Sequence, residues 1–195
     1  MGNEQYQQYI ENELIKIRFD KYWFGEFTGI RPDSRKEDEE RYFKLHPRSK
    51  YLPMEYLGKK RTGVLPSLNN VFNVASRQIQ NNRKQDFSNY TEFCVNGQRI
   101  PRAYLDKCII VVKHIHGTKT RFDVDNIYIK PVLDCLVKLE VLKEDNYNIL
   151  PEVTLWGGYE KDNDYSEIYI MPINEDYSVD WVMEFKNQLI QSWIK

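Results

Sequence analysis

The spacing of apolar residues along the chain predicts helices that alternate with strands. Residues 106–117, with the sequence DKCIIVVKHIHG, are apolar and rich in β-branched side chains, so they predict a buried strand. Two further apolar runs, residues 151–159 and 166–173, are separated by polar turn residues and predict a hairpin. Helical spacing of apolar residues predicts the remaining main elements, which are helices over residues 4–17, 69–84, 131–139 and 176–195.

The segments nearer the N-terminus have weaker patterns. Residues 21–30 predict a strand and a turn, 31–41 a charged loop or exposed helix, and 62–72 a short strand that ends in a turn. This order of elements indicates an α/β (α+β) fold, in which helices flank a small mixed sheet and a helix ends the chain. We expect an N-terminal extension, residues 1–62, packed on a core domain, residues 63–195.

The composition indicates a globular protein, because 41% of its 195 residues are hydrophobic. No apolar run approaches the roughly 20 residues that a bilayer-spanning helix needs, so we expect no membrane contact. The N-terminal residues are polar and acidic, unlike a secretory signal. The spacing of Cys94, Cys108 and Cys135 fits no zinc motif, and we expect reduced thiols in a cytoplasmic protein.

Charge is distributed unevenly along the chain. Residues 41–122 carry 16 basic and 4 acidic side chains, a net charge of +12, whereas residues 123–195 have a net charge of −9 and residues 1–40 of −4. A basic middle segment suits a polyanion, and an acidic end suits cations. Residues 41–61 also mix seven basic residues with aromatic ones, which suits phosphate contact and base stacking. The alternatives are that the two segments neutralise each other and that these aromatic residues are buried.

Acidic residues gather where the strongest predicted strand gives way to a helix. Asp123 and Asp125 are two residues apart, so on an extended chain they point the same way and repel each other unless water or a cation lies between them. Asp145 follows the predicted helix, and an antiparallel return of the chain would bring it back towards them. Carboxylate oxygens are the ligands that Mg²⁺ prefers. The alternatives are a helix cap at Asp125 or Asn126 and an ordinary turn at Asp145.

Other polar residues of this region have candidate roles. Lys119 and Arg121, in the sequence KTR, would meet a phosphate, and Lys130 would stabilise the charge of a transition state. His114 and His116 alternate along the strand and therefore face one way, which suits a metal ion. The sequence shows no third ligand for such an ion, and ordinary polar strand residues are the favoured interpretation.

These motifs together resemble one known family. RFDVDNIYIKPVLDCL at 121–136, followed by VLKEDNYNI at 141–149 and preceded by LPSLNNVF at 65–72, looks like the RusA family of Holliday-junction resolvases, which is common in prophages. The resemblance covers roughly residues 63 to 173. It lies in the combination of the motifs and their order.

The resemblance implies a Mg²⁺-dependent endodeoxyribonuclease, with Mn²⁺ as an alternative ion, that resolves four-way DNA junctions by paired symmetric nicks as a homodimer. It makes Asp123, Asp125 and Asp145 the catalytic, metal-binding carboxylates and places Lys130 at the position of the helix lysine of the family. Candidate DNA-binding residues are Asn69, Asn70, Arg77, Lys119 and Arg121.

The chain departs from the family pattern at three points. Three residues separate Asn126 from Lys130 where the family has two, Pro131 follows the lysine, and Glu144 stands where an aspartate is common. The alternative function is a phage protein that binds branched DNA or a host protein without cutting, and the N-terminal extension is a candidate surface for such a host partner. A nuclease acting on flaps or RNA and a structural protein are further alternatives.

Overall fold

The structure is a computed structural model that describes residues 3–28, 36–49, 64–65, 77–119 and 123–194, and every structural statement below concerns these residues. Four strands form one sheet in the order β1-β4-β2-β3. The central strand β2 pairs with β3 in parallel and with β4 antiparallel, and β4 also pairs antiparallel with β1. The strands are β1 (Ile15–Asp20), β2 (Cys108–His116), β3 (Glu152–Tyr159) and β4 (Tyr165–Pro172).

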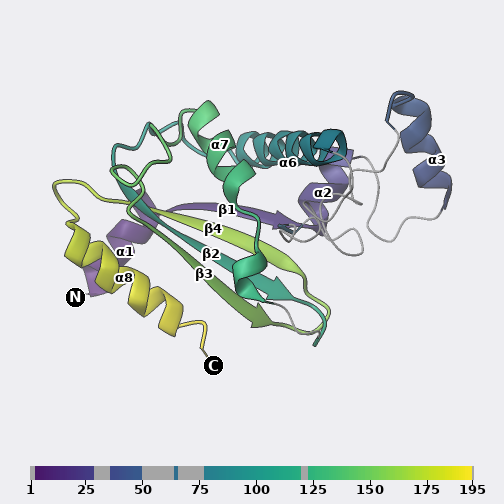
Figure 1. Cartoon of the computed structure of the whole chain (residues 1–195). Helices are drawn as coiled ribbons and strands as arrows, with labels where there is room; N and C mark the ends of the chain where they lie inside the picture. Colours follow the sequence, from purple (N-terminus) through teal and green to yellow (C-terminus); the bar gives the residue numbers. More distant parts are fainter. Residues whose placement is uncertain (1–2, 29–35, 50–63, 66–76, 120–122, 195) are drawn as a thin grey trace.

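Helices cover both faces of the sheet, with α6 and α7 on one side and α1 and α8 on the other (Figure 1). This arrangement confirms the predicted fold class, a small mixed sheet flanked by helices. No helix in the described part of the chain is long and apolar enough to cross a membrane. The helices are α1 (Asn3–Asn12), α2 (Lys21–Thr28), α3 (Lys36–Leu45), α6 (Arg77–Gly97), the 3₁₀ turn η2 (Val124–Asn126), α7 (Lys130–Lys138) and α8 (Val179–Gln191).

Each face of the sheet has its own hydrophobic core. On one face Ile110 and Ile168 pack with Phe87 of α6 and Leu136 of α7. On the other, residues of β2 and β4 pack with Tyr9 of α1 and with Val182 and Phe185 of α8. Burial of one such side chain contributes roughly 1.5–3 kcal/mol. The two cores hold β2 and β4 from both sides.

The N-terminal predictions were partly wrong. The predicted helix 4–17 ends at Asn12, and the chain then forms strand β1, whose side chains alternate between buried and accessible. Residues 21–28 of the predicted strand and turn form helix α2, and residues 29–30 lie outside the described residues. The boundary proposed after residue 62 lies outside the described residues, but β1 belongs to the same sheet as the core strands.

Helix α6 extends further along the chain than predicted. Helix α6 runs from Arg77 to Gly97, whereas the predicted helix ended at residue 84. The first part of that prediction, residues 69–76, lies outside the described residues, as does most of the predicted strand 62–72. Val64 and Leu65, the described part of that segment, are buried but belong to no strand.

The predicted hairpin between the last two strands is wrong. Both strands form, but β2 lies between β3 and β4. The connecting loop passes the end of β2, where the backbone N–H groups of Glu160 and Asp162 donate to the carbonyl oxygens of His116 and Gly117, each at 3.0 Å. The apolar strand β2 satisfies its backbone on both sides, and this pairing outweighs the local preference for a hairpin.

The parallel connection from β2 to β3 contains the motifs of interest. Parallel strands cannot be joined by a tight turn, so the chain crosses back through a helix, here η2 and α7. The acidic turn, which we define as residues 123–126, follows β2. The KEDN loop, defined as residues 143–146, lies between α7 and β3.

Candidate functional site

Lys130, at the start of helix α7, links that helix to the KEDN loop. It is the first residue of α7, and its Nζ donates to Asp134 Oδ1 and to Asp145 Oδ2, each at 2.5 Å. These two hydrogen bonds, to Asp134 and then Asp145, raise the pKa of Lys130 above its usual value. The side chain is therefore a positive charge held between two carboxylates.

Backbone contacts hold the KEDN loop against the segment that precedes β2. Leu142 forms a parallel bridge with Leu105, whose carbonyl oxygen accepts from the Lys143 N–H at 3.2 Å. Within the loop, Asn146 Oδ1 accepts from the Asn148 N–H at 2.9 Å, and Asn146 Nδ2 donates to Glu144. Glu144, the residue that departs from the family pattern, is thus bonded inside the loop.

The acidic turn is a 3₁₀ turn held by its backbone. The N–H of Asn126 donates to the carbonyl oxygen of Asp123 at 3.0 Å, and the side chains of Asp123 and Asp125 are both exposed. Neither Asp125 nor Asn126 caps α7, because the N-cap position is Ile129, with Pro131 in the first turn of the helix. The extra residue before Lys130 is therefore accommodated between η2 and α7.

The acidic turn lies against strand β3 through one close contact. A Cβ on Gly157 would lie 2.6 Å from Val124 Cγ2, so only glycine allows η2 to approach the strand this closely. Gly157 is in register with His114 of β2. Asp123 and Asp125 are thus carried by a turn that rests on the second half of β3, while Asp145 precedes that strand.

Carboxylates are hard oxygen donors, so the chemistry of Asp123, Asp125 and Asp145 suits Mg²⁺. Among the described residues, however, no group of three or more His, Cys, Asp or Glu side chains is arranged to hold a metal ion. The structure joins Asp145 to Lys130, and the convergence of the three carboxylates stays a prediction.

The predicted DNA-binding residues fall in different parts of the chain. Arg77 begins α6 and is exposed. Lys119 is exposed, and its Nζ lies 5.6 Å from the ring centre of Tyr159, whose side chain is also exposed. Asn69, Asn70 and Arg121 lie outside the described residues, so their roles stay predictions.

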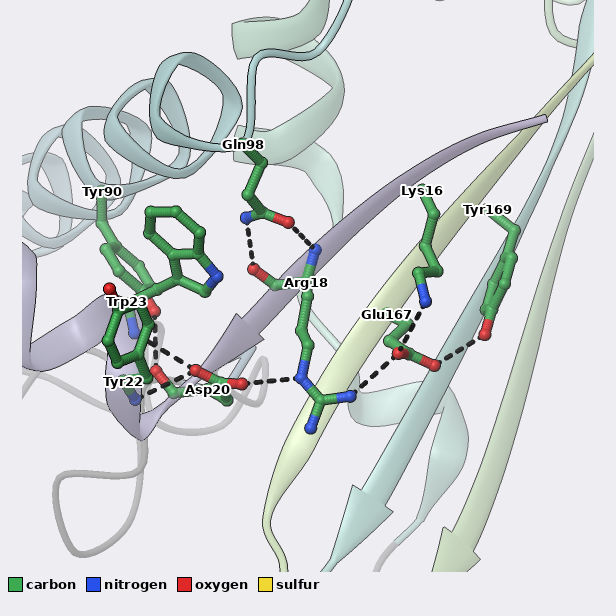
Figure 2. A network of polar contacts seen from close by, with 9 residues as sticks. All are labelled: Lys16, Arg18, Asp20, Tyr22, Trp23, Tyr90, Gln98, Glu167 and Tyr169. Carbon is green, nitrogen blue, oxygen red and sulfur yellow. Dashed lines mark hydrogen bonds and ion pairs between the residues drawn. The ribbon is translucent and has the colours of Figure 1, made fainter. Parts of the chain in front are cut away.

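A charged network on β1 and β4 was not foreseen from the sequence (Figure 2). Arg18 donates to Asp20 Oδ2 at 2.6 Å and to Glu167 Oε1 at 2.9 Å. Glu167 is buried, and it also accepts from Tyr169 Oη at 2.6 Å and lies 3.6 Å from Lys16 Nζ. Burial acts to raise the pKa of Glu167, but the Tyr169 hydrogen bond and the two positive charges outweigh it and lower the pKa.

The same network closes the edge of the sheet at β1 (Figure 2). Gln98 Oε1 accepts from the Arg18 N–H at 2.8 Å, and Gln98 Nε2 donates to the Arg18 carbonyl oxygen at 2.7 Å. Tyr90 Oη donates to the Asp20 carbonyl oxygen at 3.2 Å. Asp20 Oδ1 accepts from the Tyr22 and Trp23 N–H groups at the start of α2. Gln98 and Tyr90 thus form hydrogen bonds with backbone groups of β1 that, on an open edge strand, are available to pair with another chain. We therefore assign the network a structural role.

Comparison with models of protein families found none that matches this chain, and no curated protein matches it significantly.

Proposed function

We propose that the chain is a structure-specific endodeoxyribonuclease that resolves four-way DNA junctions, as the RusA family does. The observation that carries the proposal is the ion pair between Lys130 and Asp145, whose atoms lie 2.5 Å apart. It joins the two halves of the motif, which are 15 residues apart in the chain.

The order of the motif on the fold supports the proposal. A central buried strand leads into the acidic turn, a lysine opens the next helix, and the chain returns through an acidic loop to a parallel strand. The RusA resemblance has the same order of strand, acidic motif, helix lysine and second acidic motif. The motifs therefore follow one another along a single strand–helix–strand unit. The proposal depends on this combination, because each motif alone is common.

In this proposal Asp123, Asp125 and Asp145 would hold Mg²⁺ or Mn²⁺. Such an ion supplies positive charge that activates water and stabilises the leaving oxygen of a phosphodiester. Lys130 holds Asp145 at the start of α7 and places a second positive charge beside it. The ammonium group can then stabilise negative charge on a phosphate that reaches the acidic turn.

The substrate class follows from charge and symmetry. The basic segment 41–122, with a net charge of +12, would hold DNA arms through their phosphates, and its binding would weaken steeply with salt. A four-way junction needs two coordinated cuts, and a two-fold homodimer supplies two equivalent sites.

A second candidate function is binding of branched DNA without cutting. The observation that favours it is that Lys130 pairs with both Asp134 and Asp145, while no three-ligand metal group occurs among the described residues. A protein of phage origin could keep the fold and the basic segment for binding alone, to DNA or to a host protein.

A cleavage assay on a labelled synthetic four-way junction separates these functions. The substrates are the junction, a flap, a linear duplex and an RNA hairpin, each with Mg²⁺, with Mn²⁺ and with EDTA. We expect paired symmetric nicks in the junction that require the divalent ion. Junction binding with no nicks under either ion would favour the second candidate, and preferential cutting of the flap or the RNA would contradict the proposed substrate.

A further inference from the structure

Two histidines of the central strand face each other on the sheet face that the acidic turn covers. His114 Nε2 and His116 Nε2 lie 3.1 Å apart, and the two rings are inclined by 80°. The Nδ1 atom of His114 lies 2.6 Å from Ser166 Oγ, and that of His116 lies 3.9 Å from Asp164 Oδ1. Each ring therefore has an oxygen near Nδ1, while its Nε2 is turned towards the other ring.

The contact between the two Nε2 atoms is a hydrogen bond in the structure, and a transition metal bound by both atoms would replace it. A ligating histidine uses one ring nitrogen for the ion and donates the other N–H to an oxygen, which fixes the ring and its tautomer. Ser166 Oγ is within hydrogen-bond distance of His114 Nδ1, and the carboxylate of Asp164 lies beside His116 Nδ1 at a longer distance. Both come from β4 and the loop before it, so they orient the pair from outside strand β2.

We propose that His114 and His116 form a two-histidine chelate for a divalent transition metal, for which Zn²⁺ is the natural probe. Two imidazole nitrogens bound to one tetrahedral Zn²⁺ at about 2.0–2.1 Å would lie about 3.3 Å apart. The observed separation of 3.1 Å needs only a small adjustment to admit the ion. Water or further donors complete the coordination.

This site is independent of the proposed nuclease chemistry. Imidazole suits Zn²⁺, Ni²⁺ and Cu²⁺, whereas Mg²⁺ prefers carboxylates and water. The histidine pair lies close to the acidic turn, because His114 is in register with Gly157, the residue that Val124 of the turn contacts. A bound ion would tie the end of β2 to the loop that carries Asp164, and it would stiffen the support of that turn.

The test is Zn²⁺ binding to the full chain, freed of metal by chelation and followed by titration calorimetry. The variant is His116→Asn, and the matched control is His46→Asn, which changes the exposed histidine outside the pair. We expect one ion per chain in the parent protein and in the control, and at least tenfold weaker binding in His116→Asn. Equal binding in both variants, or no saturable binding to the parent protein, would overturn the proposal.

A second variant covers the case in which His116→Asn does not fold. Asp164→Asn keeps the oxygen that accepts from the Gly117 N–H at 2.9 Å but removes the negative charge beside His116. Loss of such a partner weakens metal affinity by roughly 10–100-fold, so unchanged affinity would count against the proposal. The absorption spectrum of the Co²⁺ form separates imidazole from thiolate ligands, and a thiolate signal would assign the ion to the three cysteines instead.

Discussion

Lys130 and Asp145 form an ion pair that closes the loop between helix α7 and strand β3, and the same ammonium group also bonds Asp134. The pair lies at a partly exposed surface, where such interactions contribute little to stability. In the proposed function, this positive charge held between two carboxylates stabilises negative charge on a bound phosphate.

Lys130→Gln separates that role from stability. The free energy of unfolding should fall by no more than about 1 kcal/mol, as for other exposed ion pairs. Junction nicking should fall about 100-fold, the usual loss when a charge-stabilising donor is removed. Urea unfolding and single-turnover nicking measure the two effects.

The matched control for this experiment is Lys138→Gln on the same helix. Lys138 Nζ pairs with Glu92 Oε2 at 2.8 Å, away from the KEDN loop. This variant should nick junctions at the parent rate. Equal losses of activity in the two variants would mean that Lys130 acts only through the stability of α7.

Gly157→Ala tests whether the acidic turn must rest on β3. The added Cβ would collide with Val124, so η2 must shift, at a cost of roughly 1–3 kcal/mol. Both the melting temperature and junction nicking should fall. Shortening the other partner, in the double variant Gly157→Ala/Val124→Ala, should restore much of both. Failure of the double variant to recover either property would show that the close contact is not what positions the turn.

Gln98→Ala tests the closure of the β1 edge. The variant removes both hydrogen bonds to the Arg18 backbone, and we expect a loss of about 1–2 kcal/mol in the free energy of unfolding. Gln85→Ala is the control, because Gln85 bonds Asn89 on the exposed surface of α6 and its loss should cost at most about 0.5 kcal/mol. Urea titration of both variants gives the comparison, and equal losses would show that Gln98 does not protect the edge.

Asp86→Asn should stabilise the protein in a pH-dependent way. Burial raises the pKa of Asp86 from 3.8 to about 6, so the folded state holds this proton more tightly than the unfolded chain does. The resulting stability is complete below pH 4 and is lost as pH rises through about 6. At pH 7.5 the variant should therefore be more stable than the parent by about 1–2 kcal/mol.

Unfolding at pH 4 and pH 7.5 checks this prediction. The two proteins should differ much less at the lower pH, because the carboxyl group of the folded parent protein is then neutral. Asp176→Asn, at an exposed position, is the control for the substitution itself. A destabilised Asp86→Asn at pH 7.5 would show that the carboxylate has a favourable partner.

The sequence predicted the strands β2, β3 and β4 because each is a distinct apolar run. It did not predict β1, because Leu14 and Ile17 fit a helix as well as Ile15, Ile17 and Phe19 fit a strand, and Ile17 belongs to both patterns. The order of strands in the sheet was also out of reach, because the pairing of β2 with two partners depends on contacts far apart in the chain.

The candidate site, too, was predictable from the sequence only where its contacts are local in the chain. The sequence predicted that the KEDN loop returns towards Asp123 and Asp125. In the structure Asp145 of the loop pairs with Lys130 of α7, and the loop lies against the segment that precedes β2, so its approach to Asp123 and Asp125 stays a prediction. The pair of Arg18 and Glu167 joins residues that are 149 positions apart, so local patterns carry no sign of it. The histidine pair lies on one predicted strand, but Ser166 and Asp164, which orient it, become neighbours only in the folded sheet.

The most direct test of the proposed function compares Asp125→Asn with the parent protein on a labelled four-way junction. Asp162→Asn, at an exposed loop position whose φ of 59° asparagine tolerates, is the control. With Mg²⁺ present, Asp125→Asn should bind the junction as the parent does and fail to nick it, while the control binds and nicks. Undiminished nicking by Asp125→Asn would contradict the assignment of the acidic turn as the catalytic centre.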